Sequence, residues 1–410
     1  MMDINFNELV KINRIRKGFT QDELALMTNM SKKKLSAIEC GRLTLQEDDK
    51  TLLLEALDID VQLLNDVLVN LDKSIWKAFH TIVYSEPGLP NIDAEITKIL
   101  NTTPIALNLT AVNLYLFTKA VLMNNKKEIE LYRKQIENYI DTLSNNHKAT
   151  FYDFYATFLF NSGLYEEAIV YLDKALYYVT DNGLKGYIFY HYGYVYSEMY
   201  QCLQAYEYYQ KALVIFNETN NYVKVVYTYI TLADIYNRMK QRKEAIQYLL
   251  KARIISNKLT DINDSIKNTI LVNLSWLYLF TQDYDNSILY AKEALPNEKK
   301  DKLYFCLAYV YYKKQDFYQS LNYIEIGTSE LSANNLLYKI LLLLKKIIKD
   351  YAGSRELLCK TYDEANYNDR EIKLLLLDMI MEYSNYFDDN ELKIKYCTEY
   401  RNILMIDDTL

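Results

Sequence analysis

Small residues recur at three fixed positions through the middle of this chain. The first position holds Ala168, Ala205, Ala245, Ser287 and Ser320. Seven residues after each of these stands one of Ala175, Ala212, Ala252, Ala294 and Gly327. Twelve residues before each stands one of Ala156, Gly193, Ala233, Ser275 and Ala308. Because small side chains let facing helices approach closely, the pattern predicts a stack of similar helix pairs.

The spacing and the local motifs resemble the tetratricopeptide repeat. The first small residues are 33 to 42 residues apart, near the 34-residue period of that repeat. The segments Gly163-Leu-Tyr-Glu-Glu-Ala168 and Tyr209-Gln-Lys-Ala-Leu213 match it closely. Five repeats are clear, residues 105–145 look like a degenerate leading pair, and residues 335–366 and 370–405 look like degenerate trailing pairs. The resemblance implies a right-handed superhelical solenoid with a concave groove.

Composition favours an all-α chain and argues against several functional classes. Gly and Pro together are 13 of 410 residues, too few for a β-sandwich or for glycine-rich phosphate loops. The three histidines are dispersed, and no motif of a metalloprotease or serine hydrolase is present, so we expect no catalytic residues, no metal and no cofactor. The five cysteines stand at least 38 residues apart without a CxxC, which favours reduced thiols.

Two features of the sequence lead us to expect a cytoplasmic protein. The polar start of the chain (Asp3, Asn5, Asn7, Glu8) is unlike a signal peptide. The longest apolar run, Ile340 to Leu344, is five residues, whereas a membrane helix needs about 20.

The first seventy residues predict five helices, two of them joined by a tight turn. Thr20 and Glu23 have the spacing of a capping box and open a short helix over residues 21–27. Asn29 stands at the turn, where a left-handed residue is needed, and Ser31 caps a helix over residues 32–39. Two short helices joined in this way indicate a helix-turn-helix unit.

Residues 5–70 resemble the lambda-repressor-like (XRE) DNA-binding domain, through Gly18-Phe-Thr-Gln-Asp-Glu-Leu-Ala25 and Met30-Ser31 with Leu35-Ser-Ala-Ile-Glu-Cys-Gly41. The resemblance implies that the helix over 32–39 enters the major groove. Lys32, Lys33 and Ser36 would face bases, and Ala37 would touch a thymine methyl group. Gln21 matches a phosphate contact, whereas Arg14 and Glu39 match a structural ion pair between the first and third helices.

The charge balance of residues 11–42 fits DNA binding. Eight basic residues against three acidic ones give this segment a net charge of +5, in a chain of net charge −7. Ser31, Lys34 and Arg42 complete the candidate DNA-binding set, because phosphate neutralisation needs such a patch. The alternative is that Lys32, Lys33 and Lys34 form only a solvated charge run.

Polar and aromatic residues are expected on the concave side of the solenoid, which the first helix of each repeat lines. The candidate peptide-binding residues are Asn161, Tyr190, Tyr194, Asp234, Asn237, Arg238, Asn273, Trp276, Tyr309 and Tyr312. Asn offers a donor and an acceptor to the main chain of an extended peptide, and Arg238 could bind a carboxylate in a fork. His191 on the same side is expected to be a hydrogen-bonded spacer. For each residue the alternative is repeat packing or a solvated face.

An XRE domain followed by a tetratricopeptide superhelix resembles the RRNPP peptide-pheromone receptors (the Rgg, NprR and PlcR types and the DNA-free Rap proteins), and in length the NprR type. The resemblance implies a homodimeric quorum-sensing transcription regulator that binds an operator in double-stranded DNA and a short, secreted and re-imported signalling peptide. Within that family, groove asparagines hold the peptide backbone, which favours Asn161, Asn237 and Asn273. One alternative is an adaptor that sequesters a response regulator, as Rap proteins do. Another is a prophage-type repressor without a peptide ligand.

The domain organisation that follows is an XRE domain over 1–70, a linker helix and loop over 71–104, and a repeat domain over 105–410. The C-terminal part has more apolar residues than one helix face needs: Leu336, Leu337, Ile340, Leu341, Leu344, Ile347, Ile348 and Leu374 to Leu377. These residues indicate either a dimerisation surface or internal packing of the last repeats.

Overall fold

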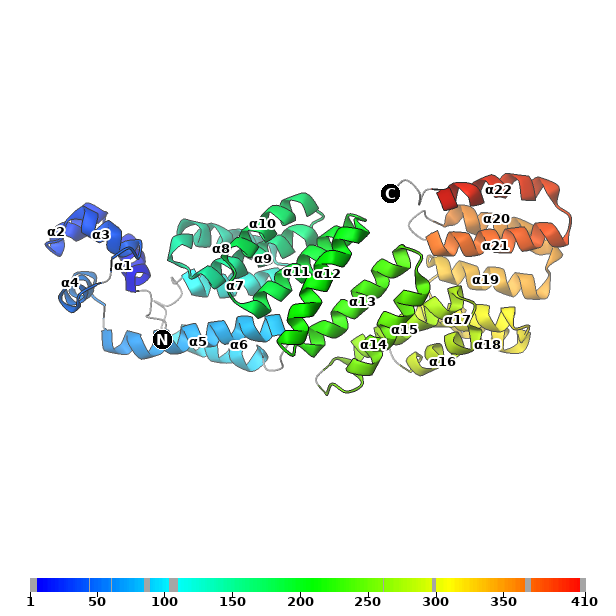
Figure 1. The fold of residues 1–410 in the computed structure, drawn as a ribbon, viewed down its shortest axis with the longest axis horizontal. Helices are drawn as coiled ribbons and strands as arrows, with labels where there is room; N and C mark the ends of the chain where they lie inside the picture. The colour runs from blue at the N-terminus through cyan, green and yellow to red at the C-terminus, as the bar shows by residue number, and fades with distance from the viewer. Residues whose placement is uncertain are drawn as a thin grey trace. The chain divides into compact units, whose positions relative to one another are not determined.

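The all-α prediction is confirmed by a computed structural model of the chain (Figure 1). The structure describes residues 6–43, 45–59, 61–84, 89–102, 110–260, 262–296, 300–365 and 370–405, and these ranges contain helices and no strand. The expected boundary between linker and repeat domain, at residues 104 and 105, lies outside them. None of the helices in these ranges combines the length and the apolarity that a bilayer crossing demands.

Four short helices open the chain: α1 (Phe6–Arg16), α2 (Gln21–Met27), α3 (Lys32–Glu39) and α4 (Glu47–Leu57). The bounds of α2 and α3 agree with the sequence prediction. The capping box of α2 is formed, since the Thr20 N–H donates to the Glu23 carboxylate at 2.7 Å and the Glu23 N–H donates to Thr20 Oγ1 at 3.2 Å. Asn29 has φ +53° between α2 and α3, as the expected tight turn requires.

The core formed by α1–α4 is mainly apolar, and its buried polar residues are Asn13, Thr28 and one ion pair. Leu24, Leu35 and Ile38 are completely buried. Beside them Arg14 Nε donates to Glu39 Oε1 at 2.5 Å, and both side chains are at most 10% exposed. The expected structural pair between α1 and α3 is therefore present.

The next helix, α5 (Val61–Tyr84), is longer than the sequence pattern suggested. Helical patterns over 61–69 and 75–83 predict two helices, but the backbone continues through the residues between them. The physical reason is that residues 61–84 contain no Gly or Pro to end a helix. Helix α6 (Leu89–Thr102) pairs with α5.

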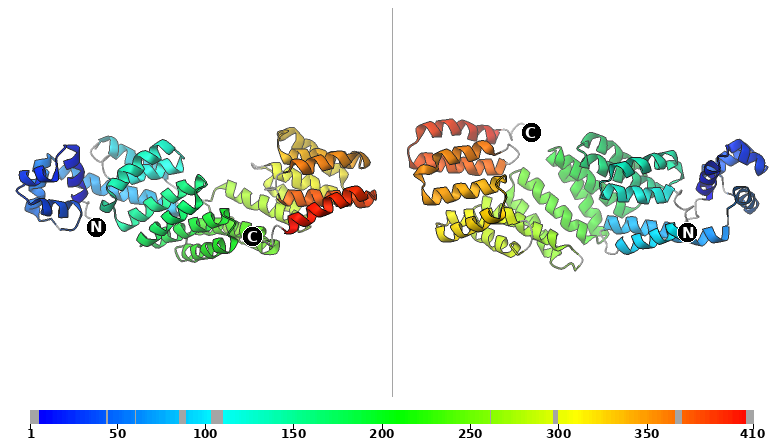
Figure 2. Two further views of the ribbon diagram at one scale, coloured as in Figure 1. Left: turned by 90° about the horizontal axis from the view of Figure 1, so that it is seen from above. Right: turned by 180° about the vertical axis from the view of Figure 1, so that it is seen from behind.

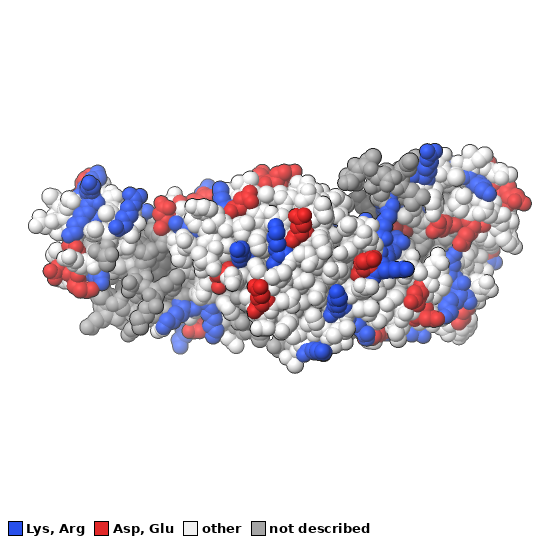
Figure 3. Space-filling view, viewed as in Figure 1, with Lys and Arg blue, Asp and Glu red and all other residues white. Residues whose placement is uncertain are grey.

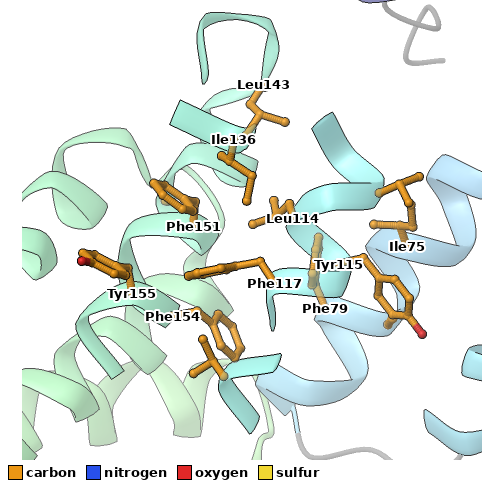
Figure 4. Close-up of a cluster of buried hydrophobic side chains, with 14 of the residues drawn as sticks. Ile75, Phe79, Leu114, Tyr115, Phe117, Ile136, Leu143, Phe151, Phe154 and Tyr155 are labelled. Atoms are coloured by element: carbon orange, nitrogen blue, oxygen red, sulfur yellow. The ribbon is translucent and has the colours of Figure 1, made fainter. Parts of the chain in front are cut away.

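The chain divides into two compact units, residues 1–228 and 229–410, which are described separately. The solenoid part of the first unit continues with α7 (Thr110–Leu122), α8 (Lys126–Asn138), the short η2 (Ile140–Thr142), α9 (Asn145–Asn161), α10 (Tyr165–Tyr178), α11 (Asn182–Glu198), α12 (Cys202–Glu218) and the start of α13 (Tyr222–Arg238). Aromatic rings dominate its core, where Phe79, Phe117 and Phe151 from three different helices meet (Figure 4).

The second unit holds the remainder of α13 and α14 (Arg242–Ser256), α15 (Asp264–Phe280), α16 (Tyr284–Ala294), α17 (Lys300–Lys313), α18 (Phe317–Glu330), α19 (Leu336–Lys349), η3 (Ala352–Ser354), α20 (Arg355–Glu364), α21 (Arg370–Tyr386) and α22 (Asn390–Met405). The helices lie side by side as successive pairs (Figures 1 and 2). The degenerate pairs expected over 105–145, 335–366 and 370–405 are α7 and α8, α19 and α20, and α21 and α22.

The C-terminal apolar residues pack inside the second unit. Leu337, Ile340, Leu341, Leu344, Ile347 and Leu375 to Leu377 are at most 8% exposed, and Leu336, Ile348 and Leu374 pack against the same core. Internal packing therefore accounts for these residues, and none of them is left as a wide exposed apolar face.

The small repeat residues lie where the helices of a pair cross. A Cβ on Gly193 would come within 2.6 Å of the Tyr209 ring, so any larger residue at this crossing of α11 and α12 would require that ring to shift. Next to the crossings, tyrosines twelve residues apart stack on one another: Tyr196 on Tyr208, Tyr236 on Tyr248, Tyr278 on Tyr290, and Tyr311 on Tyr323. Much of the tyrosine in this chain therefore packs the two helices of one pair together.

Candidate DNA and peptide interfaces

The N-terminal turn of α3 presents the residues expected to read DNA. The Ser31 hydroxyl caps the helix by accepting a hydrogen bond from the Lys34 N–H at 3.1 Å. Lys32 and Lys33 are exposed, while Ser36 and Ala37 are half-buried on the next turn. Because a capped helix N-terminus attracts anions, this end of α3 can bind phosphate as well as base edges.

Two of the three lysines of α3 already contact acidic side chains. Lys32 Nζ lies 2.7 Å from Asp22 Oδ2, and Lys34 Nζ lies 2.8 Å from Asp49 Oδ1. Lys33 makes no ion pair with a described residue. Exposed ion pairs contribute little, so a phosphate could replace Asp22 at low cost.

Basic and acidic side chains are both present at this end of the chain in the view of Figure 3. Basic side chains lie over the α1–α3 part with acidic ones beside them, and acidic side chains are more frequent over α4. Arg42, which follows α3, is exposed. The basic side of the unit is thus available to a polyanion.

Gln21 has a structural contact that the sequence did not indicate. Its Nε2 donates to Glu39 Oε2 at 2.8 Å, so it shares that carboxylate with Arg14. To bind a phosphate as predicted, Gln21 would have to use the other N–H of its amide, or its bond to Glu39 would have to break.

The candidate peptide-binding residues fall in both compact units. In the first unit, Asn161 is exposed as the last residue of α9, and Tyr190 and Tyr194 are half-buried on α11. The Tyr194 ring lies 4.9 Å from the Phe160 ring, and burial raises the pKa of Tyr190. Both tyrosines are therefore only partly packed into the first unit.

His191 is held by a buried carboxylate, as the spacer interpretation predicts. Its Nδ1 lies 2.8 Å from Asp153 Oδ1, and the Asp153 side chain is completely buried. Asp153 Oδ2 has no hydrogen-bond partner among the described residues. Three aromatic rings surround the imidazole, and the nearest, Tyr187, lies 4.3 Å away between ring centres.

Sequence reasoning missed a lysine beside this cluster. Lys224 Nζ lies 4.6 Å from the centre of the Tyr187 ring and 5.5 Å from that of Tyr227. Burial lowers the pKa of Lys224 to about 8. The sequence did contain an indication of this residue, because a lysine in the first turn of a helix is disfavoured by the helix dipole.

In the second unit, α13 carries three of the candidates. Arg238 Nε donates to Asp234 Oδ2 at 2.8 Å, so the predicted fork is already engaged with a carboxylate one turn away. Asn237 is half-buried, and its Oδ1 has no hydrogen-bond partner among the described residues. An unsatisfied buried acceptor of this kind is costly, and a donor supplied by a ligand would satisfy it.

A residue of α21 contacts one of the candidate residues on α15. Trp276 Nε1 donates to Glu371 Oε2 at 2.6 Å, and the Arg242 guanidinium lies 3.6 Å from the other oxygen of Glu371. Lys302 Nζ lies 5.0 Å from the centre of the Trp276 ring. A ligand that used the Trp276 N–H would therefore have to displace Glu371. Asn273, one turn before Trp276, is half-buried.

A second contact joins α17 and α21 near the last two candidates. Lys313 Nζ lies 2.6 Å from Glu382 Oε1. Tyr309 is only 6% exposed, Tyr312 is half-buried, and burial raises the pKa of both phenols. Tyr309 thus belongs more to the core of the second unit than to an open surface.

No cluster of three or more metal-ligating side chains occurs within the ranges that the structure describes. None of the five cysteines, all of them described residues, forms a disulfide, and burial raises the pKa of Cys306 to about 12, so its thiol is unreactive.

Comparison with known proteins identifies the repeat and the fold. A family model described as tetratricopeptide repeat matches residues 186–258. No curated protein matches the chain by sequence.

Solved structures resemble most of the chain. The apo form of RapI has a TM-score of 0.64 at 19% identity, covering 83% of this chain and 98% of its own. The apo form of the quorum sensor NprR from B. thuringiensis has a TM-score of 0.63 at 14% identity, covering 82% of this chain and 99% of its own. A Rap protein complexed with competence and sporulation factor has a TM-score of 0.58 at 15% identity, covering 82% and 98%. The chain therefore has an all-α tetratricopeptide solenoid fold that it shares with these proteins.

Proposed function

We propose that this protein is a DNA-binding transcription regulator controlled by a short signalling peptide that binds on the concave side of its repeats. The supporting observation is that one chain joins two features. The first is a capped helix with an exposed Lys33 that makes no ion pair with a described residue, and the second is a solenoid whose first helices carry half-buried polar and aromatic side chains. The likeness in fold to the quorum sensor NprR over 82% of the chain supports the solenoid part of the proposal. The proposal includes no catalytic step.

DNA binding is tested first. The full chain selects duplexes from a randomised double-stranded DNA pool, and the enriched duplex is titrated against Lys33→Ala. Loss of one phosphate contact weakens binding to all duplexes and reduces the slope of log affinity against log salt by about 1, whereas loss of a base contact costs about 1–3 kcal/mol at one position. Lys126→Ala, an exposed lysine in the first turn of α8, is the matched control. Equal affinities of Lys33→Ala and the wild type would count against DNA recognition by α3.

Peptide control is tested on the same DNA complex. A library of synthetic heptapeptides is screened for members that change the affinity of the chain for the enriched duplex. Asn237→Ala is expected to abolish that effect and to leave DNA binding intact, because an amide that pairs with the peptide main chain is lost. Asn217→Ala, on the second helix of its pair, serves as the control. If no peptide alters DNA binding, the chain is a repressor without a peptide ligand.

We also propose that the regulator acts as a homodimer, because two helix-turn-helix units on half-sites about 34 Å apart add their phosphate contacts. Light scattering of the full chain with and without the enriched duplex measures the stoichiometry, and a single copy per duplex would contradict it.

The likeness to RapI favours a second candidate, an adaptor that sequesters a response regulator. This candidate is tested by measuring the binding of a panel of purified response regulators to the chain in the absence of peptide. A single tight partner would support this activity, alone or beside DNA binding.

A further inference from the structure

The first unit contains an ammonium group that the protein leaves without an acceptor. Lys224 Nζ donates no hydrogen bond to any described residue, and no described carboxylate lies within 4.0 Å of it. Its neighbours are instead aromatic: the ring centres of Tyr187, Tyr227 and Tyr190 lie 4.6, 5.5 and 6.0 Å away. These contacts join the first helices of two successive pairs, α11 and α13.

Folding alone does not favour a lysine at this position. Asn221 Oδ1 caps α13 by accepting from the Lys224 N–H at 3.2 Å, so Lys224 stands in the first turn, where the helix dipole disfavours a cation. The side chain is half-buried, and burial lowers the pKa of its ammonium to about 8. An apolar side chain of similar length, such as Met, would pack against the same rings without these costs.

The nearby carboxylate does not serve as the ion-pair partner. Asp153 raises the pKa of Lys224, which shows that the two charges interact, but Asp153 Oδ1 is bonded to His191 and the group lies beyond 4.0 Å from Nζ. Coulomb energy falls as the inverse of distance, so an incoming carboxylate in direct contact with Nζ would interact more strongly than Asp153 does. Burial also raises the pKa of Tyr187 and Tyr190, which keeps both phenols protonated as hydrogen-bond donors.

We propose that Lys224 is the anion-binding point of the first unit and binds a carboxylate of a peptide ligand among the rings of Tyr187, Tyr190 and Tyr227. The carboxylate is either an acidic side chain or the free C-terminus of the peptide. This inference rests on the proposed peptide-binding function and adds the chemical class of ligand.

The experiment compares four sets of synthetic heptapeptides for retention by the full chain. The sets either contain or lack one acidic residue, and each is made with a C-terminal carboxylate and with a C-terminal amide. The wild type is expected to retain peptides with a carboxylate at least tenfold better than neutral amidated ones. The two sets with a single carboxylate show which source the site uses.

Three variants separate charge from packing. Lys224→Met is expected to retain the four sets equally, and Lys224→Arg is expected to keep the preference because the charge is kept. Lys211→Met is the matched control, since Lys211 is an exposed lysine 4.5 Å from the Tyr208 ring on α12. Circular dichroism checks that each variant is folded.

The outcomes are distinguishable. Equal retention of all four sets by the wild type, or an unchanged preference in folded Lys224→Met, overturns the role of Lys224 while peptide binding stands. Retention of no set by the wild type contradicts the peptide-binding function itself, and the anion site falls with it.

Discussion

The buried ion pair between α1 and α3 allows the sharpest prediction, the effect of Glu39→Ala. The Arg14 guanidinium donates to Glu39 Oε1 at 2.5 Å, to Glu39 Oε2 at 3.0 Å and to the Phe19 carbonyl at 2.7 Å. The Arg14 and Glu39 side chains are 10% and 0% exposed. Removing Glu39 leaves a buried cation without its partner, which costs about 3–5 kcal/mol. At about 1.4 kcal/mol per factor of ten, the unfolded fraction of α1–α4 rises roughly a hundred- to several-thousand-fold.

Hydrogen exchange of the full chain measures this effect locally. Amides of residues 6–43 are expected to exchange much faster in Glu39→Ala, while those of α9–α12 are unchanged. The double variant Arg14→Met/Glu39→Leu is expected to recover most of the protection, because an apolar pair removes the unpaired charge. Lys17→Ala is the control, since its 4.0 Å pair with Asp58 is exposed and contributes little. Wild-type exchange in Glu39→Ala, or a double variant as labile as the single one, would refute the reasoning.

Three further predictions follow from packing, backbone conformation and charge. Gly193→Ala forces a Cβ to within 2.6 Å of the Tyr209 ring and should destabilise the chain by about 1–3 kcal/mol, read as a lower midpoint of thermal unfolding; an unchanged midpoint would mean that the ring can move. Lys240→Gly should raise the urea midpoint of unfolding by an amount equivalent to about 0.5–1 kcal/mol. Its φ of +61° costs an L-residue about 1–2 kcal/mol, and the greater freedom of glycine in the unfolded chain offsets part of the relief. A lower midpoint would contradict this prediction. For Lys224, the folded pKa of about 8 is below the ordinary 10.5, so the unfolded chain binds the extra proton between these values. The unfolding free energy of the wild type minus that of Lys224→Met should therefore rise between about pH 8 and pH 10.5. Asp153, His191 and the neighbouring tyrosines are present in both proteins, so their contributions cancel in this comparison. A difference that does not change with pH would show that Lys224 is solvated.

Much of the fold could be predicted because its signals are local. The capping box at Thr20 and Glu23, the left-handed turn at Asn29 and the small repeat residues each act within one or two helices, so their spacing carries the information. The sequence pattern did not predict that α5 is continuous, because the gap in its apolar residues was interpreted as a helix end. Such an end is better assigned only where Gly or Pro also stands in the gap, and residues 61–84 contain neither.

The interhelix turns could not be predicted from the glycine content of the chain. Tyr200, Lys240, Gln282 and Gln315 all adopt positive φ at the turn within a helix pair, where glycine would be expected. The scarcity of glycine therefore did not mean fewer turns. It means that the packed helix pairs hold ordinary residues in a conformation that costs each of them about 1–2 kcal/mol.

The sequence by itself determined the all-α class, the tight turn between α2 and α3, the pairing of helices and the Arg14–Glu39 pair, because each depends on residues at fixed short spacings or on a motif that spans one small unit. Only the tertiary structure decided which polar groups of the candidate site are already engaged. Glu371 bonds Trp276 from 95 residues away, and Asp153 holds His191 while Lys224 is left among tyrosine rings. Such contacts depend on how successive pairs rotate about one another, and small rotations at each interface accumulate over several repeats beyond what any local pattern records.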